Sequence, residues 1–213
     1  MTQAAIALGA NLGDPRTTLL AVRPLLAALL RQWAREQEWP EEPGRPPRLR
    51  WSPLFRTAPV GGPADQPPYL NAVMVVDGGP ARAPADRPAL QAGEGQQAPS
   101  QALAAQELLE RLLALERRFG RVRGERWGPR SLDLDLLWCG SAPLQRPGLC
   151  LPHPHLRERA FVLAPLAAIE PGLIVCGDGV QPALPAGVLL AALPPQALEP
   201  PPERLPGCPG WPE

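Results

Sequence analysis

The sequence predicts an α+β fold in which an antiparallel sheet carries helices on one face. Three observations support this class. Short apolar or alternating runs of strand length occur at residues 4–8, 48–56, 72–76 and 131–137, and apolar residues recur at helical spacing in two longer segments. The predicted elements follow one another as strand–helix–strand–strand–helix–strand, which is the order of a ferredoxin-like sandwich, and a C-terminal addition comes after them.

The first strand and the first helix are separated by a short turn. Residues 4–8 are apolar, and residues 9–13 contain Gly and Asn, which favour tight turns. Asp14 suits the N-cap of a helix because its carboxylate can accept the first free backbone amides, and Pro15 suits the first helical position. Apolar residues then mark one helical face to about Trp33, and a proline inside this segment predicts a kink.

Two further strands are predicted in the middle of the chain. Residues 48–56 alternate between apolar and polar side chains, and residues 72–76 are all apolar. Residues 57–71 between them are rich in proline and glycine, and loops of this length inside a compact domain are usually functional. Asn71 offers both a hydrogen-bond donor and an acceptor, although Asn is also an ordinary turn residue before a strand.

The second helix and the last predicted strand flank an arginine-rich loop. Apolar residues recur at helical spacing in residues 101–119, and Gly120 is the residue type that commonly follows a helix end. In residues 131–137 leucines alternate with polar residues, among them Asp133 and Asp135. Because successive side chains of a strand point to opposite faces, we expect the leucines in the core and both aspartates together on the other face.

Two segments have the composition of disordered chain. Residues 78–101 lack aromatic residues and apolar periodicity, and residues 181–213 are rich in proline with one short apolar stretch. Such segments bury too little apolar surface to offset the entropy lost on ordering. The sequence therefore predicts a single domain at residues 1–180 that is interrupted by a disordered insertion at 78–101, and a mostly disordered tail at 181–213.

The paired aspartates and the loop before them indicate a site for magnesium and phosphate. Two carboxylates on one face of a strand suit a hard divalent cation, and magnesium completes its shell with water and phosphate oxygens. The formal net charge of the chain is zero, so the positive charge of this loop is local and attracts polyanions. The alternatives are an Asp-x-Asp pair at a strand edge without metal and a solvated arginine cluster. The loop arginines, interspersed with glycines, are Arg121, Arg123, Arg126 and Arg130.

Residues 126–137, RWGPRSLDLDLL, resemble the signature of the 6-hydroxymethyl-7,8-dihydropterin pyrophosphokinase family of folate synthesis, and the resemblance extends over residues 4–77 and about 102–175. It implies an enzyme that transfers pyrophosphate from ATP to the hydroxymethyl group of the dihydropterin and releases AMP. It also implies two magnesium ions at Asp133 and Asp135. The expected partners are these small molecules, without nucleic acid or membrane, and we expect a monomer.

The resemblance also assigns site residues position by position. The implied catalytic residues are Arg121, Arg130, Asp133 and Asp135. The residues implied for the nucleotide are Glu116, Arg123, Trp127, Leu136, His153 and Arg159. The residues implied for the pterin are Gly9, Thr57, Ala58, Val60, Tyr69, Asn71 and Phe161.

Two of these assignments compete with structural roles. Glu116 lies one turn before the end of the second helix, and we prefer to interpret it as an ion-pair partner of a neighbouring arginine rather than as a residue near the adenine. Trp127 would close over the site as part of a lid with Arg121 and Arg130, where the glycines permit motion. Simple packing of Trp127 is the alternative.

The chain departs from the family pattern at several positions. One departure, Gly148, falls where some relatives carry a further phosphate-binding arginine, so that contact is missing or is supplied by Arg146 or Arg157. The other departures are Ala10, Ala58, Gly62 and Leu113.

A single-stranded RNA-binding module is the competing class, because the same topology serves such modules. They stack bases on exposed Phe or Tyr of the sheet, whereas this chain has 3 Phe and 1 Tyr. No run of 18 apolar residues and no signal-peptide pattern occur, so a cytoplasmic location is expected. The cysteines form no Cys-x-x-Cys pair, and His153 and His155 have no third ligand beside them, which argues against zinc.

Overall fold

The computed structural model describes residues 3–37, 47–77, 97–122, 127–140 and 142–212, and only the backbone of residues 97–100. The helices are α1 (Pro15–Glu36), α2 (Gln97–Arg118), η2 (Leu156–Glu158), α3 (Ala160–Ile169), α4 (Ala186–Ala191) and η3 (Pro195–Leu198). The strands are β1 (Gln3–Ala10), β2 (Arg48–Trp51), β3 (Phe55–Thr57), β4 (Tyr69–Asp77), β5 (Asp133–Cys139), β6 (Leu144–Arg146), β7 (Leu149–Leu151), β8 (Ile174–Val175), β9 (Leu184–Pro185) and β10 (Glu203–Arg204).

An antiparallel sheet forms the centre of the molecule. Its strands are hydrogen-bonded in the order β10–β3–β4–β1–β5, and β2 also pairs with β4. β1 lies between β4 and β5, so that Gly9 is paired with Asn71 on one side and with Asp133 on the other. The predicted antiparallel sheet is therefore confirmed, although residues 48–56 form two short strands rather than one.

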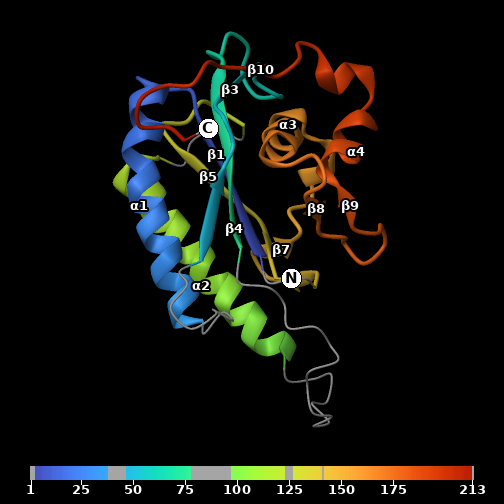
Figure 1. The fold of residues 1–213 in the computed structure, drawn as a ribbon. Coiled ribbons are helices and arrows are strands. Elements are labelled where there is room, and N and C mark those ends of the chain that lie inside the picture. Colours follow the sequence, from blue (N-terminus) through green and yellow to red (C-terminus); the bar gives the residue numbers. More distant parts are fainter. Residues whose placement is uncertain (1–2, 38–46, 78–96, 123–126, 141, 213) are drawn as a thin grey trace.

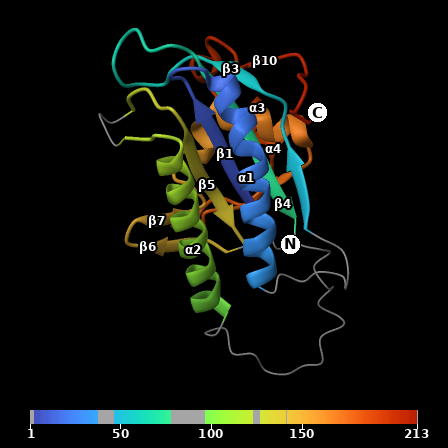
Figure 2. The same cartoon turned by 90° about the vertical axis from the view of Figure 1, so that its left-hand side faces the viewer.

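Helices α1 and α2 lie side by side on one face of the sheet (Figures 1 and 2). α1 begins as predicted, because the Asp14 carboxylate accepts a hydrogen bond from the amide of Thr17 (3.1 Å) and Pro15 occupies the first turn. It continues to Glu36, slightly beyond the predicted end, with Pro24 inside it. None of the described helices is long and apolar enough to cross a membrane.

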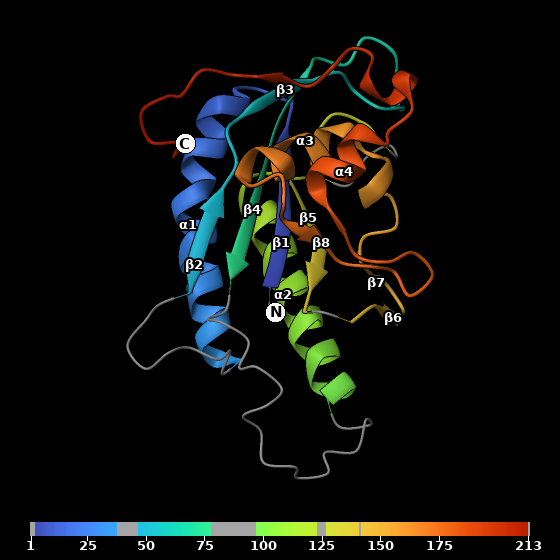
Figure 3. The same cartoon turned by 45° about the vertical axis from the view of Figure 1, so that its right-hand side comes forward.

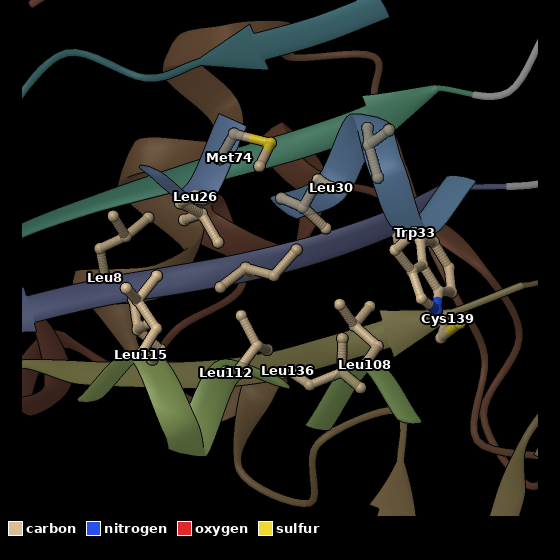
Figure 4. Close-up of a cluster of buried hydrophobic side chains, with 14 of the residues drawn as sticks. Leu8, Leu26, Leu30, Trp33, Met74, Leu108, Leu112, Leu115, Leu136 and Cys139 are labelled. Atoms are coloured by element: carbon tan, nitrogen blue, oxygen red, sulfur yellow. The ribbon is translucent and has the colours of Figure 1, made fainter. Parts of the chain in front are cut away.

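The first core lies between these two helices and the sheet (Figure 4). Alternate residues of β1, β4 and β5 point into it, which confirms that the leucines of residues 132–136 face a core. At one end the indole of Trp33 donates a hydrogen bond to the carbonyl of Ala104 in α2 (3.0 Å), so the two helices are also joined directly. The side chains labelled in Figure 4 are Leu8, Leu26, Leu30, Trp33, Met74, Leu108, Leu112, Leu115, Leu136 and Cys139.

The opposite face of the sheet is covered as well, and the prediction of helices on one face is therefore wrong. α3 and α4 lie on this second face (Figures 1 and 3), where they close a separate apolar cluster. The run of apolar residues at 72–76 indicates this second covered face in the sequence, because a strand that is apolar at successive positions is buried on both sides. The sheet residues of this second core are Ala5, Val73, Val75, Leu137 and Trp138.

Residues 181–212 form regular elements, which corrects the expectation of a mostly disordered tail. They include β9, α4, η3 and β10, and Leu189, Leu205 and Trp211 among them are buried. Composition misled here because a few large side chains dock onto cores built by distant parts of the chain. Of the predicted insertion, residues 97–101 belong to α2, and residues 78–96 lie outside the described residues.

Leu112→Ala should destabilise the fold, because Leu112 is fully buried between α2 and the sheet. Removing a buried leucine costs about 2–5 kcal/mol through lost burial and the cavity left behind. Urea denaturation would measure the change in unfolding free energy. Leu103→Ala on the same helix is the control, since Leu103 is 72% exposed. Similar losses in both variants would contradict this description of the core.

Candidate active site

A cavity of about 410 Å³ lies on the second face of the sheet, beside α3. On this face β4 and β5 are polar where they line the cavity and apolar where they meet the core under α3. β4 presents Asn71 to the cavity and Val73 to the core under α3, and β5 presents Asp135 to the cavity and Leu137 to that core. The cavity is lined by Ala7, Leu8, Gly9, Thr57, Ala58, Val60, Gly61, Tyr69, Asn71, Trp127, Arg130, Asp133, Asp135, His153, His155, Glu158, Arg159 and Phe161.

The cavity brings together most of the residues predicted from the sequence. Every residue predicted for the pterin lines it, as do both predicted metal ligands and the predicted catalytic residue Arg130. Of the residues predicted for the nucleotide, Trp127, His153 and Arg159 line it. Arg123 lies outside the described residues. The side chain of Leu136 is in the first core, on the opposite face of the sheet, so only its backbone remains for the predicted nucleotide contact.

Asp133 is the centre of the charged half of the cavity. One of its carboxylate oxygens accepts a hydrogen bond from the guanidinium of Arg121 (2.5 Å), and the other accepts one from the guanidinium of Arg130. Asp135 lies on the same face of β5 and approaches Arg159 at 3.6 Å. Burial, together with the neighbouring charge of Asp133, raises the pKa of Asp135 to about 6.

Glu116 lies behind this cluster and has its side chain almost fully buried. It accepts a hydrogen bond from the amide of Leu134 (2.7 Å) and pairs with Arg121, which confirms the predicted ion pair with a neighbouring arginine. Burial raises the pKa of Glu116 to about 7, against the opposing effects of the Leu134 amide and the Arg121 charge. Glu116 therefore orients Arg121 from outside the cavity.

The opposite half of the cavity is built around Asn71. The side-chain amide of Asn71 donates to the hydroxyl of Thr57 (2.7 Å), which fixes the orientation of both side chains. Gly9 is required beside them, since a Cβ on this residue would lie 2.7 Å from Oδ1 of Asn71. The hydroxyl of Tyr69 donates to the carbonyl of Gly128 (3.1 Å), so this half is also tied to the arginine-rich loop.

Asn11 joins the loops on the two sides of the cavity, a role that the sequence analysis missed. Its side-chain amide donates to the carbonyl of Pro67 (3.0 Å), and its side-chain oxygen accepts the amide of Arg130 (2.7 Å). The backbone amide of Asn11 also donates to the Arg130 carbonyl (3.0 Å). Asn11 is 2% exposed, and both ends of its side-chain amide are hydrogen-bonded. These two features distinguish it from an ordinary turn residue.

Trp127 lies at the mouth of the cavity against the loop that follows β3. Its backbone is in the left-handed region (φ 58°), and its carbonyl accepts a hydrogen bond from the side chain of Gln66 (3.0 Å). A Cβ on Gly61 would lie 3.1 Å from the indole ring, so the absence of a side chain there allows the close approach. Trp127 therefore packs against this loop, and its role in a lid stays a prediction.

His153, Arg159 and Phe161 form the wall of the cavity on the α3 side. The amide of His155 donates to Nδ1 of His153 (3.3 Å), which leaves the proton of a neutral imidazole on Nε2. Burial, and then the nearby charge of Arg159, lower the pKa of His153 to about 4. The guanidinium of Arg159 lies 5.4 Å from the ring centre of Phe161, at cation–π distance.

Other residues of this wall were not predicted, or were left open. His155 and Glu158 line the cavity as a pair (3.1 Å) that the sequence analysis did not assign. Arg157 was one candidate for the missing phosphate contact, but its guanidinium donates to the carbonyls of Cys176 (3.1 Å) and Pro182 (2.6 Å) and is thus committed to a C-terminal loop. Arg146 is exposed on β6.

The donor set of the cavity fits magnesium better than a transition metal. Among the described residues, no group of three or more His, Cys, Asp and Glu side chains comes together to hold a metal ion. Asp133 and Asp135 supply two carboxylates without thiolate, and magnesium is commonly bound by one or two carboxylates plus substrate phosphates.

Comparison with known proteins identifies the family. A family model described as 7,8-dihydro-6-hydroxymethylpterin-pyrophosphokinase matches residues 97–171. The chain is 38% identical to the 2-amino-4-hydroxy-6-hydroxymethyldihydropteridine pyrophosphokinase of Pseudomonas aeruginosa, over 95% of this chain and 96% of that protein. The chain belongs to this pyrophosphokinase family. The protein of the same name from Methylorubrum extorquens is 34% identical, over 88% of this chain and 98% of its own length.

The match to the pyrophosphokinase family model covers the charged half of the cavity. Residues 97–171 run from α2 to the end of α3 and thus include Asp133 and Asp135 on β5 and Arg159 at the start of α3. The other half of the cavity, around Thr57 and Asn71, lies outside this match.

Glu116→Gln should remove a pH dependence of stability. The folded-state pKa of Glu116 is about 7, above its ordinary value of 4.5. The stability that Glu116 contributes is therefore complete below its ordinary pKa of 4.5, and this contribution is lost as the pH rises through 7. Between pH 5 and pH 8 the parent chain should lose roughly 2–3 kcal/mol of unfolding free energy relative to the variant, measured by urea denaturation. A constant difference would show that Glu116 stays charged throughout.

Proposed function

We propose that this chain uses the cavity on the second face of its sheet to transfer pyrophosphate from MgATP to the hydroxymethyl group of 6-hydroxymethyl-7,8-dihydropterin, releasing AMP. Membership of the pyrophosphokinase family establishes the class of reaction in folate biosynthesis. The observation that carries the assignment of the site is the division of one cavity into two halves. One half holds Asp133, Asp135 and arginines, and the other holds the bonded pair Thr57 and Asn71.

The pterin is assigned to the half around Asn71. The edge of a pterin ring presents donors and acceptors side by side, and the Asn71 amide together with backbone groups of Thr57, Ala58 and Val60, as the family resemblance implies, can match them. The Phe161 ring provides an apolar face for stacking. This binding mode would point the hydroxymethyl group towards Asp133 and Asp135 on the neighbouring strand.

The triphosphate is assigned to the charged half. Arg130 and Arg159 line the cavity, and Arg121 is held beside it by Glu116. The neutral His153 can donate a hydrogen bond from Nε2 to a phosphate oxygen at neutral pH without adding charge. These groups are fixed before the substrate arrives, so they can stabilise the charge that develops during transfer with little rearrangement.

Asp133 and Asp135 would hold the two magnesium ions implied by the family resemblance. When bound, magnesium neutralises the phosphate oxygens and lowers the barrier to attack on the β-phosphorus. Arg121 and Arg130 share the carboxylate of Asp133 in this structure, so both guanidiniums already lie beside one of the two proposed magnesium ligands. They would exchange Asp133 for the phosphates when this carboxylate holds magnesium.

Three further expectations belong to this proposal. The order β1–α1–β2/β3–β4–α2–β5 is that of a ferredoxin-like sandwich. A monomer and a cytoplasmic location stay predictions from the sequence. The RNA-binding alternative is weaker, since Tyr69 and Phe161 line a cavity rather than an open sheet surface, and two carboxylates occupy the site strand.

The purified chain, given ATP, magnesium and 6-hydroxymethyl-7,8-dihydropterin, should release AMP. Separation of the nucleotides by chromatography measures this directly, and the reaction without the dihydropterin is the control. Release of ADP would mean transfer of a single phosphoryl group and would overturn the proposal. Salt-dependent RNA binding without any nucleotide product would favour the other class.

Asp135→Asn should separate metal binding from scaffolding. The folded-state pKa of Asp135 is raised to about 6, so its charged form opposes folding at pH 8 and a neutral Asn should leave the melting temperature unchanged or higher. Loss of an anionic magnesium ligand should slow pyrophosphate transfer by roughly a thousandfold. A lower melting temperature with a modest loss of rate would instead make Asp135 a structural partner of Arg159.

Asp133→Asn is the companion variant. Asp133 pairs with both Arg121 and Arg130, so this variant should lose stability as well as activity. The two variants therefore differ in stability and agree in rate if both carboxylates bind magnesium.

A further inference from the structure

The strand that leads into the pterin half of the cavity is short and lies near the edge of the sheet. β3 has three residues and pairs with β4 on one side. Without the C-terminal segment, its other side would expose unpaired backbone groups. β10 covers this side by pairing Glu203 with Arg56 and Arg204 with Phe55. Directly after β10, the amide of Leu205 donates to the carbonyl of Leu54 (2.8 Å).

Trp211 fixes the backbone just before β3. The side chain is buried, and its indole N–H donates to the carbonyl of Ser52 (2.8 Å) while its ring meets Trp51 edge to face, with centroids 5.5 Å apart. Ser52 is fully buried, and its hydroxyl accepts the amide of Val73 in β4 (2.9 Å). The indole of Trp211 thus combines apolar packing with a hydrogen bond to the buried residue Ser52, which lies between β2 and β3.

The same segment is anchored to α1. The side chain of Arg23 donates to the carbonyl of Gly210 (3.1 Å), and its guanidinium lies 5.8 Å from the ring centre of Trp51. Figure 3 shows the segment crossing the β3 end of the sheet from the side of α4 to the side of α1. Residues 203–211 therefore form a strap from α1 across the carbonyls of Ser52 and Leu54 to the outer side of β3.

β3 carries the effect of this strap to the cavity. Its last residue, Thr57, accepts the side-chain amide of Asn71, and Ala58, Val60 and Gly61 follow directly and line the cavity. The cavity-lining residues include none of residues 203–211, so the strap can act on the site only through the elements it holds. β5, which carries the aspartates, is at the opposite end of the strand order from β10.

We propose that residues 203–211 position the pterin half of the cavity, with Trp211 as the main positioning residue. The inference rests on the assignment of the pterin to this half. Holding β3 in place before binding removes an ordering cost that the pterin would otherwise have to offset, so the strap strengthens pterin binding. The nucleotide half should be affected less, because β10 pairs with β3 and the residues assigned to the nucleotide lie on β5, in the loop before β5 and between β7 and α3.

Trp211→Phe tests the proposal, because it keeps an aromatic ring and removes the donor to Ser52. Loss of this bond should raise the KM for 6-hydroxymethyl-7,8-dihydropterin about five- to tenfold, with kcat and the KM for MgATP within about twofold. Amide hydrogen exchange of residues 54–60 should become faster. Deletion of residues 199–213 should raise the pterin KM at least as much.

Trp33→Phe is the matched control. Trp33 is also a buried indole that donates to a backbone carbonyl, that of Ala104 (3.0 Å), but it joins α1 to α2. This variant should lose stability to a similar extent as Trp211→Phe while both KM values stay unchanged.

An unchanged pterin KM in Trp211→Phe would overturn the proposal. An equal rise in Trp33→Phe, or a rise of both KM values together, would also overturn it, because stability alone would then explain the effect. Failure of the proposed function itself has a different signature, in which the parent chain releases no AMP from ATP and the dihydropterin.

Discussion

The alternation of side chains along β1, β4 and β5 is the constraint on which the rest of the structure depends. On one face it places every second residue in the core under α1 and α2. On the other face the same strands are apolar where α3 and α4 cover them and polar where the cavity lies, as in the pairs Asn71 and Val73 or Asp135 and Leu137. A shift of register by one residue would therefore move the aspartates into the core under α1 and α2 and move the leucines of β5 to the face with the cavity.

Charge in the cavity is balanced within the protein itself. Asp133 pairs with Arg121 and Arg130, and Glu116 pairs with Arg121 as well, so two carboxylates oppose the charges of these two arginines. Burial of these groups makes each pairing matter more than a surface pair would, since removal of one partner leaves a charge with poor solvation. Burial raises the pKa values of Asp135 and Glu116, and the nearby charge of Asp133 adds to this effect, which shows the cost of placing these acids away from water.

The two halves of the cavity are joined by hydrogen bonds between side chains and the backbone of distant loops. Asn11 binds the loop before β4 and the arginine-rich loop at once, and the Gln66 side chain holds the carbonyl of Trp127. The strap of residues 203–211 supports the pterin half from the far side of β3. A site that must align two substrates is thus fixed from several directions, although many of its residues lie on loops.

The sequence by itself determined the strands at residues 4–8, 72–76 and 131–137, the two long helices and the shared face of Asp133 and Asp135, because periodicity is a local property. Through the resemblance of its motifs to a known family, it also indicated most of the residues that line the cavity. Only the tertiary structure decided that the second face is covered by α3 and α4, that the tail docks through Leu205 and Trp211, that Leu136 points away from the cavity and that Asn11 joins its loops. The physical reason is that each of these depends on contacts between residues far apart in the chain, where a single buried side chain or hydrogen bond outweighs the average composition of its segment.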